Sequence, residues 1–289
     1  LWSRGLGDVY KRQLAGLKER IPMSASLATP FETSSIVAVA TYNEKENLPV
    51  LLSQIRQHSP NSHILVIDDN SPDGTGQLAE QLGRKMGRVA VIHRSGKLGL
   101  GTAMVAAMKY ALQEGFGVVV TMDADLSHDP AVLPRLLAGL AEKDVMIGSR
   151  YIPGGGTENW PLLRKVLSKS VNILVRTLHG LPARDNSGGY RAYRTPLLNR
   201  IDIDNLLSVG YSFQEEMLLR CHRAGAAIGE TPIVFADRRE GASKVNLKEC
   251  ARSLGMLLYL GVPRFLGGPN LAPLANPQKG IARELRKSA

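Results

Sequence analysis

Short runs of β-branched residues alternate with amphipathic stretches from about residue 34 onward, and this alternation constrains the fold more than any other feature of the chain. Few polar residues interrupt the runs, as is typical of strands buried on both faces of a parallel sheet. The stretches between them have the spacing of helices with one apolar face. The alternation therefore predicts an α/β fold in which a mostly parallel central sheet carries helices on both faces.

The first half of the chain is expected to supply five strands, at Ser34–Thr41, His63–Asp68, Arg88–His93, Gly117–Met122 and Val145–Ser149. The helices between them are expected at Leu48–His58, Gln77–Met86, Thr102–Gln113 and from Asp129 onward, where Asp suits the cap and Pro130 the first helical position. After Tyr151 the expected elements are helices at Leu162–His179, at Phe213–Ala224 and up to about Leu266, and a strand at Ile228–Phe235. Ser212 and Glu215 have capping-box spacing. Residues 186–194 mix glycines with aromatic residues, and no element is predicted for them.

Length and composition allow one large α/β domain or two modest ones: the chain has 289 residues, of which 44% are hydrophobic and 21% charged. Disordered, collagen-like and disulfide-rich classes are excluded, and the two cysteines lack metal-ligand spacing. No stretch approaches the roughly 18 apolar residues of a membrane-spanning helix. We expect one domain at 34–268, an N-terminal extension at 1–33 and a basic, disordered tail at 269–289. Residues 1–13 resemble a translated adaptor sequence, and we expect them not to belong to the natural protein.

The net charge of +10 points to anionic partners, but its distribution narrows the choice. Residues 1–23 and 269–289 each carry +3, which leaves +4 for the body of the chain. A nucleic-acid-binding protein would gather Lys, Arg and aromatic residues on one face. Because much of this excess lies near the two ends, we expect phosphorylated substrates or an anionic membrane surface and no specific nucleic-acid binding.

Carboxylates follow three of the predicted strands. The strand ends read Thr41-Tyr-Asn-Glu44, Asp68-Asp69-Asn and Asp123-Ala-Asp125. Since ligands of open parallel sheets bind outside the carboxyl ends of the strands, these side chains should meet at one edge. Asp and Asn are also common turn residues, so one of them alone would mean little. Acidic groups on three strand ends are harder to explain as turns.

The pair Asp123 and Asp125 is expected to hold a metal ion. Asp202 and Asp204 have the same spacing, but they follow a polar segment and suit a solvated turn. Two carboxylates at the mouth of a buried strand would instead repel each other and raise each other's pKa unless a cation joined them. Magnesium or manganese, with oxygen ligands and a substrate diphosphate, removes that conflict. Basic residues that could face the phosphates are Arg150, Arg164, Lys165, Arg238, Arg239 and Lys244.

The glycine-rich segment Gly96–Gly101 does not support a dinucleotide site. It lacks the third glycine of that fingerprint and follows the third predicted strand, where the fingerprint should follow the first. A phosphate-binding loop of the G-x-x-x-x-G-K-[ST] type is also absent. Nicotinamide oxidoreductases and P-loop enzymes are therefore disfavoured.

Seven stretches in order, from about Ser34 to Leu266, resemble the family 2 glycosyltransferases of GT-A fold, and within them the short polyprenyl-phosphate (dolichyl-phosphate) mannose synthases that lack transmembrane helices. The stretches are 41–49, 68–75, 98–103, 122–130, 148–151, 210–217 and 228–244. A D-x-D pair alone is a weak signal, whereas this ordered set is specific. The resemblance implies a GT-A domain, an inverting glycosyltransferase, GDP-mannose as donor, a polyprenyl monophosphate as acceptor, and Mg²⁺ or Mn²⁺ as cofactor.

The resemblance also implies roles for individual residues. Nucleotide-sugar binding would fall to Thr41, Tyr42, Glu44, Asp68 and Asp123, the metal to Asp123 and Asp125, catalysis to Asp125, Arg150 and Arg238, and the acceptor phosphate to Arg164, Ser243 and Lys244. Ser127 stands where archaeal relatives carry a glutamine ligand, and either Ser127 or water would complete the metal shell.

The chemistry of the acceptor decides whether a general base is needed. A phosphate monoester has a second pKa near 6, so it is already largely anionic at neutral pH and needs only positive charge to hold it. A hydroxyl acceptor would need a carboxylate base, for which Glu215 or Glu216 could serve. The downstream Q-x-x-R-W motif of hydroxyl-using relatives is absent, which favours the phosphate. A UDP-glucose-dependent transfer to polyprenyl phosphate and a transfer to a hydroxyl remain the alternatives.

A polyprenyl acceptor stays in the bilayer, so we expect the enzyme to lie peripherally on the cytoplasmic face of a membrane. The stretches Arg164–His179 and Leu254–Leu266 could contact the lipid, since amphipathic helices with basic residues bind anionic interfaces. Packing on the sheet explains either stretch equally well. A separate membrane-anchoring partner would fit the same expectation.

Overall fold

The computed structural model describes residues 31, 34–208, 210, 212–236, 247–262, 266–269, 271 and 273. Three residues with predicted roles, Arg238, Ser243 and Lys244, lie outside the described residues, as do residues 1–30 and most of the predicted tail.

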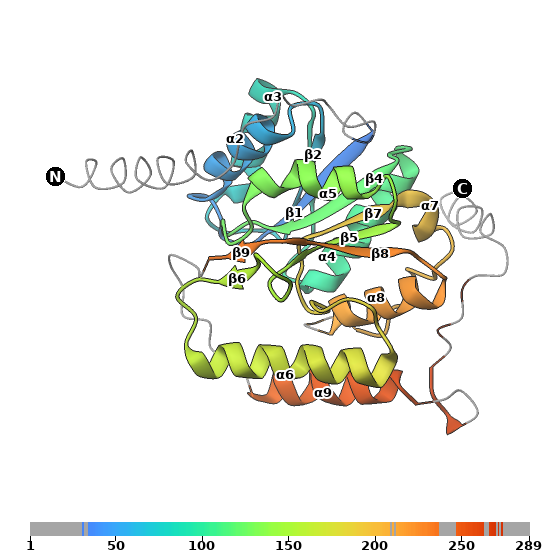
Figure 1. The fold of residues 1–289 in the computed structure, drawn as a ribbon. Coiled ribbons are helices and arrows are strands. Elements are labelled where there is room, and N and C mark those ends of the chain that lie inside the picture. The colour runs from blue at the N-terminus through green and yellow to red at the C-terminus, as the bar shows by residue number, and fades with distance from the viewer. Residues whose placement is uncertain are drawn as a thin grey trace.

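Seven strands form the central sheet in the order β3-β2-β1-β4-β7-β5-β8 (Figure 1). Their bounds are β1 Ser35–Thr41, β2 His63–Asp68, β3 Val89–His93, β4 Val118–Asp123, β5 Val145–Ser149, β7 Arg191–Arg194 and β8 Ile228–Pro232. Only β7 runs antiparallel among them; it pairs with β4 on one side and with β5 on the other. The predicted mostly parallel α/β sheet is therefore confirmed.

Helices cover both faces of this sheet and bury two separate apolar clusters (Figure 1). One face carries α2 Leu48–His58, α3 Thr75–Met86, the 3-10 turn η1 Pro130–Val132 and α5 Leu133–Gly139. The other carries α4 Leu100–Gln113, α6 Leu162–His179, α7 Thr195–Leu198, α8 Phe213–Arg223 and α9 Leu247–Leu260. Within β2, Ile64 and Val66 join the first cluster while Leu65 and Ile67 join the second, because successive side chains of a strand point to opposite faces.

The strand β7 was not predicted, and its sequence explains why. Arg191 is fully buried in this strand, and a charged residue in the middle of a sheet defeats a pattern search for apolar runs. Its guanidinium is satisfied by three backbone carbonyls, those of Gly188, Asn186 and Gln214. Two of these carbonyls lie in the turn before the strand and the third lies on α8, so a local turn and one tertiary hydrogen bond together satisfy the buried charge.

Three boundary predictions are corrected. The expected strand 228–235 divides at Ile233: β8 continues the main sheet, while β9 Val234–Phe235 pairs with β6 Gly156–Thr157 in a separate two-stranded ribbon. The last helix ends at Leu260 rather than near Leu266, because the chain turns at Gly261 and Pro263 follows. The capping box does not form, since Ser212 has helical dihedrals and its side chain makes no capping bond.

Helix α6 is the longest in the described part of the chain and lies beside α9, far from the centre of the sheet (Figure 1). It ends at Gly180, which adopts the left-handed conformation that favours glycine. Within the described residues, no helix combines the length and the hydropathy needed to cross a membrane.

Candidate active site

The carboxyl ends of β1, β2 and β4 bring the predicted donor-binding residues to one edge of the sheet. Thr41 lies beside Asp68 in the pairing of β1 with β2, and Asp123 lies beside Ala40 in the pairing of β1 with β4. The juxtaposition expected from the sequence is thus present in the structure. The individual roles of these residues stay predictions.

Asp68 is buried and orders the turn after β2. Its carboxylate accepts hydrogen bonds from the Thr41 hydroxyl (3.2 Å), the Ser71 backbone N–H (3.0 Å) and the Ser71 hydroxyl (2.5 Å). Asn70 takes a left-handed φ of 58°, which asparagine tolerates. Asp68 therefore contributes a fixed negative charge to this edge.

Two charged residues near Asp68, Arg94 and Lys97, were not predicted, and Arg94 pairs with the strand-end residue Asp69. Asp69 Oδ1 lies 2.9 Å from Arg94 Nη1, and both side chains are about nine-tenths buried. Burial raises the pKa of Asp69, while the charge of Arg94 opposes this rise. Lys97 Nζ lies 4.5 Å from the ring centroid of Tyr42, which is itself exposed. The sequence signal for Arg94 and Lys97 is a basic residue on each side of Gly96.

Glu44, also predicted for donor binding, lies in the turn between β1 and α2. Its Oε2 accepts a hydrogen bond from Asn47 Nδ2 at 2.7 Å, and its backbone N–H donates to the Thr75 hydroxyl at 3.0 Å. These bonds join the turns that follow β1 and β2, so Glu44 is held at the same edge as Asp68.

Asp123 and Asp125 follow β4 and differ in their surroundings. The Asp123 side chain is 29% exposed. Asp125 Oδ1 accepts from the Ser127 backbone N–H at 3.1 Å and from the Ser127 hydroxyl at 2.5 Å. Ser127 therefore orients Asp125 through these two bonds.

Gly189 gives Asp123 its space. A Cβ atom at this position would lie 3.6 Å from Asp123 Oδ1 and 3.4 Å from Gln214 Nε2. The turn before β7 thus brings backbone without a side chain between Asp123 and Gln214, at the start of α8. A larger residue would fill this space.

His128 supports Asp123 from within the protein. Its Nδ1 accepts the Asp123 backbone N–H at 3.0 Å, so that nitrogen carries no proton. The ring is buried and stacks on Tyr190 with centroids 5.0 Å apart. Burial lowers the pKa of His128, although the Asp123 and Asp125 charges oppose this, and the neutral ring leaves the carboxylates without a competing cation.

The donor set at this edge fits a divalent cation that shares its ligands with a substrate. Asp123 and Asp125 supply hard oxygen ligands, and within the described residues no group of three or more His, Cys, Asp or Glu side chains forms a metal site. Magnesium in nucleotide-dependent enzymes is commonly bound by one or two carboxylates together with phosphate oxygens. These two residues would therefore hold Mg²⁺ or Mn²⁺ jointly with a nucleotide diphosphate.

Arg150, at the end of β5, is buried against Asp185. Its Nε and Nη2 each lie 2.7 Å from a different carboxylate oxygen, in the two-pronged geometry of a strong ion pair. Burial disfavours the Arg150 charge, but the hydrogen bonds and the charge of Asp185 outweigh it and raise the pKa of Arg150. Asp185 was not predicted, because no sequence pattern links it to a strand 35 residues away.

Arg150 and Arg164 approach the same indole ring. The Arg164 guanidinium carbon lies 3.9 Å from the Trp160 ring centroid, and that of Arg150 lies 5.6 Å from it. Trp160 also packs against Phe235 of the β6–β9 ribbon. Two of the predicted phosphate-facing residues are thereby brought together, although α6 and β5 are separate elements.

The two glutamates considered as bases differ in their hydrogen-bond partners. The Glu216 oxygens accept hydrogen bonds from the backbone N–H groups of Leu207 and Ser208 and form an ion pair with Arg220. Glu215 is buried, its Oε2 has no hydrogen-bond partner, and burial raises its pKa to about 7. Only Glu215 retains the chemistry of a proton acceptor near neutral pH.

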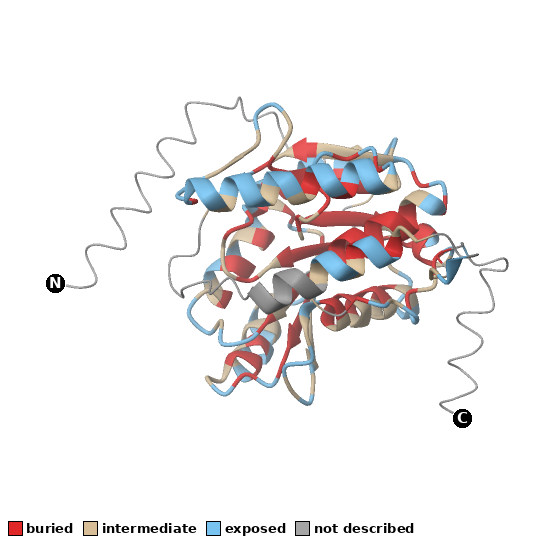
Figure 2. Ribbon diagram, turned by 90° about the horizontal axis from the view of Figure 1, so that it is seen from below, coloured by how far each residue is buried: buried red, intermediate tan, exposed pale blue. Residues whose placement is uncertain are grey.

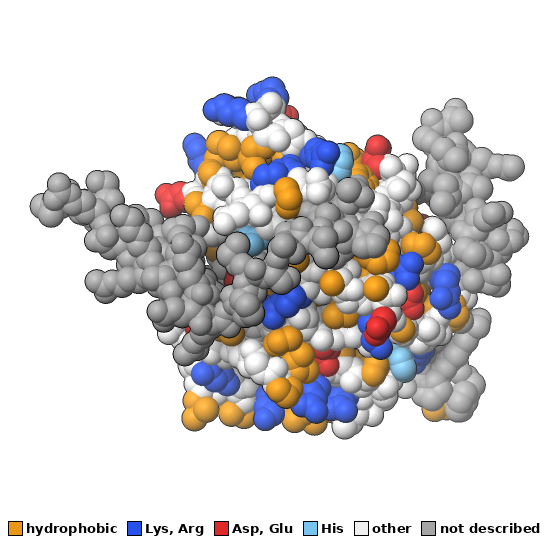
Figure 3. Space-filling view, turned by 45° about the horizontal axis from the view of Figure 1, so that its top comes forward, with side chains coloured by type: hydrophobic (Ala, Val, Ile, Leu, Met, Phe, Trp, Pro, Cys, Tyr) orange, Lys and Arg blue, Asp and Glu red, His pale blue; other side chains and the backbone are white. Residues whose placement is uncertain are grey.

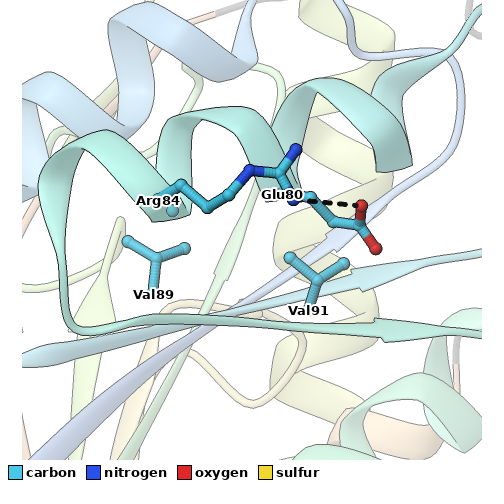
Figure 4. Close-up of a pocket in the computed structure, with 5 residues that line it drawn as sticks. Glu80, Arg84, Val89 and Val91 are labelled. Atoms are coloured by element: carbon cyan, nitrogen blue, oxygen red, sulfur yellow. Dashed lines mark ion pairs between the residues drawn. The ribbon is translucent and has the colours of Figure 1, made fainter.

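A separate hollow lies between α3 and the edge strand β3 (Figure 4). Its lining residues are Glu80, Gly83, Arg84, Val89 and Val91. Glu80 and Arg84 form an exposed ion pair with an N···O distance of 3.9 Å, and such pairs contribute little to the stability of the fold. None of the strand-end carboxylates lines this hollow, so it is not favoured as the active site.

Comparison with known sequences places the chain in a family. Residues 36–202 match the family described as "Glycosyl transferase family 2". The chain is 46% identical over 214 residues to the polyprenol monophosphomannose synthase of Mycolicibacterium smegmatis, covering 73% of this chain and 81% of the relative. It is 44% identical over 211 residues to the undecaprenyl-phosphate mannosyltransferase of Micrococcus luteus, covering 73% and 87%.

Solved structures show the same fold at low sequence identity. Glucosyl-3-phosphoglycerate synthase of Mycobacterium tuberculosis, in complex with phosphoglyceric acid, superposes with a TM-score of 0.60 and 17% identity over 86% of this chain and 87% of that one. The same enzyme in complex with Mn²⁺, UDP-glucose and phosphoglyceric acid gives a TM-score of 0.59 and 16% identity, over the same shares of the two chains. The fold is GT-A-like, and the chain is a glycosyltransferase that belongs to glycosyl transferase family 2.

Proposed function

We propose that this enzyme transfers mannose from GDP-mannose to a polyprenyl monophosphate with inversion, giving polyprenyl-phosphate mannose. The observation that carries the proposal is its similarity to two enzymes named for mannosyl transfer to polyprenol or undecaprenyl phosphate. The groups in the site suit these substrates, because strand-end carboxylates could bind a metal and a diphosphate, and two arginines lie around one indole.

The donor would lie across the ends of β1, β2 and β4. Thr41, Tyr42, Glu44 and Asp68 would bind the nucleoside, and Asp123 would adjoin the diphosphate. Asp123 and Asp125 would hold Mg²⁺ or Mn²⁺, which when bound neutralises the charge of the departing diphosphate. The fixed turn around Asp68 and the hydrogen-bonded Asp125 would keep these groups in place before the donor arrives.

The acceptor would enter from the arginine side. Its phosphate oxygen attacks the anomeric carbon, the bond from that carbon to the diphosphate oxygen breaks, and the electron pair leaves with GDP. Proton transfer is not required, since the acceptor is already anionic. Arg164, Ser243 and Lys244 would hold the acceptor phosphate, while Arg150 and Arg238 would stabilise the charge that develops between the two phosphates.

We also place the enzyme peripherally on the cytoplasmic face of a membrane, through α6. Figure 2, drawn from the α6 and α9 side, shows α6 largely exposed, and only Asn172 and Val175 of this helix are buried. Its exposed apolar residues are Leu162, Leu163, Val166, Leu167, Ile173, Leu174 and Leu178. Hydrophobic and basic side chains lie together along the lower edge of Figure 3, the edge that α6 occupies in Figure 1. This mixture suits an anionic lipid surface.

Transfer to a hydroxyl acceptor, with Glu215 as the base, is a second candidate. It is favoured by the buried Glu215 carboxyl, whose pKa of about 7 suits proton acceptance. A UDP-glucose donor with a polyprenyl phosphate acceptor is the remaining alternative, because sugar and base discrimination can rest on a few hydrogen bonds.

A four-way assay separates these candidates. Radiolabelled GDP-mannose and UDP-glucose are each offered with polyprenyl phosphate or with the corresponding free polyprenol, in the presence of Mn²⁺. The proposal expects label in the extracted lipid only with GDP-mannose and the phosphate. Label with the free polyprenol would support a base-dependent transfer, and label from UDP-glucose alone would replace the proposed donor.

A further inference from the structure

Asp185 is a fully buried carboxylate at the active-site end of the sheet that none of the proposed steps uses. It accepts four hydrogen bonds, from Gly188 N–H and from the backbone N–H, Nε and Nη2 of Arg150, at 2.7 to 3.0 Å. The pKa of Asp185 is lowered: burial alone would raise it, but the bonds from Arg150 outweigh burial. The carboxylate therefore stays charged and saturated with donors.

The hydrogen bonds leave one edge of Arg150 open. Nε and Nη2 face Asp185, and Nη2 also donates to the Ser187 hydroxyl at 2.9 Å. Among the described residues Nη1 has no hydrogen-bond acceptor. The negative charge of Asp123 acts on the same guanidinium, and the charges of Arg150 and Asp185 act on His128, which bonds the Asp123 backbone. The Arg150–Asp185 pair therefore lies within electrostatic reach of Asp123.

The turn that carries Asp185 is anchored independently of Arg150. The Glu230 carboxylate, on β8, accepts the backbone N–H groups of Arg184 and Asp185 at 2.9 and 3.0 Å. Asn172, on α6, accepts the Asn186 N–H and donates to the Ser187 hydroxyl. The 184–188 turn is thus fixed to two further elements and presents Asp185 as a rigid support.

An Arg150 guanidinium bound to Asp185 in this way is not free to form a second two-pronged ion pair with Asp123 or Asp125. An arginine close to Asp123 and Asp125 would otherwise form an ion pair with them and occupy the place of the metal and diphosphate. Asp185 engages two of the three guanidinium nitrogens in a plane set by the turn. Held this way, the guanidinium would leave Asp123 and Asp125 available, and its third nitrogen would be free to meet an incoming anion.

We propose that Asp185 is a positioning residue, which holds Arg150 so that its Nη1 edge faces the phosphates of the substrates and not the carboxylates of the metal site. This inference rests on the proposed function only in assigning phosphate to Arg150. A merely structural role for Asp185 would instead stabilise the fold without acting through Arg150.

The chain contains a matched control for the structural role. Glu216 and Arg220 form a second buried carboxylate–guanidinium pair, with Arg220 Nε and Nη2 at 2.8 and 2.7 Å from Glu216 Oε1. This pair ties α8 to Leu207 and Ser208. Arg220→Gln therefore measures what losing such a pair costs the fold.

The test is a double-mutant cycle of Asp185→Asn with Arg150→Ala on kcat/KM, together with Arg220→Gln, each measured per folded molecule. We expect Asp185→Asn to lower kcat/KM about 100-fold and Arg150→Ala to lower it about as much or more, with the double variant no worse than Arg150→Ala. Arg220→Gln should lower the thermal midpoint but leave kcat/KM within about threefold of wild type. Losses from Asp185→Asn and Arg150→Ala that multiply would overturn the proposal.

Two further measurements cover failure of folding or of the assumed substrates. Ser187→Ala removes one bond to Arg150 and should lower kcat/KM about threefold to tenfold, again only when Arg150 is present. In a Trp2→Phe background, Trp160 fluorescence reports the Kd of Mn²⁺·GDP and of Mn²⁺·UDP. If wild type transfers no mannose, the proposed function fails, but the same double-mutant cycle on the Kd values still tests the role of Asp185. An effect of Asp185→Asn on Kd that persists in the Arg150→Ala background would contradict that role.

Discussion

The strand-end site and the outer face of α6 differ in the burial of their side chains: the site buries charged groups, whereas α6 exposes apolar ones. At the site, Asp68 and Asp185 are buried charges, and each is saturated with hydrogen bonds from the protein itself. On α6, Leu162 and Leu163 are 77% and 70% exposed, with apolar surface that no described part of the chain covers. The described part of the site thus has the hydrogen-bonded carboxylates of a rigid framework, whereas α6 leaves apolar surface exposed, which fits the proposed contact with lipid.

This contrast separates chemistry from location. Changes at the site should abolish transfer without altering membrane binding, and changes on α6 should do the reverse. Each variant below tests one side of that separation.

The largest effect is expected from Asp125→Asn, which should lower transfer about 1,000-fold or more, because several kcal/mol of metal-dependent charge stabilisation would be lost. Its circular dichroism and vesicle binding should match wild type. The control is Asp204→Asn in the other D-x-D pair, where Asp204 pairs with Lys109 at the surface and the change should cost less than about threefold. Metal-dependent turnover that survives Asp125→Asn would remove this residue from the site.

A double change on α6, Leu163→Glu with Leu167→Glu, should weaken binding to anionic phospholipid vesicles about 10- to 100-fold, since it replaces exposed apolar area that would enter the lipid with charge. Transfer to a short-chain, water-soluble polyprenyl phosphate should be unchanged. Val50→Glu, at an exposed position on α2, is the matched control and should bind vesicles like wild type. Equal losses in both variants would show that α6 has no special role.

Glu215→Gln should change transfer less than about threefold, because a phosphate acceptor needs no base. Loss of several orders of magnitude with normal metal binding would establish a base and favour a hydroxyl acceptor instead.

The same variant makes a prediction about stability. Folding raises the Glu215 pKa from 4.5 to about 7, so the folded state holds a proton that the unfolded state releases in this interval. The ionisation of Glu215 therefore lowers the free energy of unfolding as pH rises from about 4.5 to about 7. Relative to wild type, Glu215→Gln should gain roughly 1–3 kcal/mol at about pH 8 and little at about pH 4, as measured by urea unfolding. An equal difference at both pH values would contradict this account.

Local pattern predicted the parallel part of the sheet well. The strands β2 and β5 and the helices α2 and α6 have the predicted bounds, because buried apolar runs and amphipathic spacing are set by neighbours along the chain. The strand β7 could not be predicted, since its buried Arg191 interrupts the apolar pattern and is stabilised in part by the Gln214 carbonyl, which only the fold brings near.

The candidate site likewise contains residues that could be predicted from the sequence and residues that could not. Residues at strand ends, such as Asp68 and Asp123, are placed by topology, so their meeting could be expected. Asp185 could not be found, because its importance comes from a partner in another element and not from any pattern around it. The absence of a capping box at Ser212 follows from a helix start whose glutamates are buried.

The measurement that tests the central claim most directly is the incorporation of labelled mannose from GDP-mannose into extractable lipid, with wild type and Asp125→Asn compared side by side. The account predicts label in the lipid phase that requires polyprenyl phosphate, a divalent cation and Asp125. Absence of label with wild type, or equal label with Asp125→Asn, would contradict it.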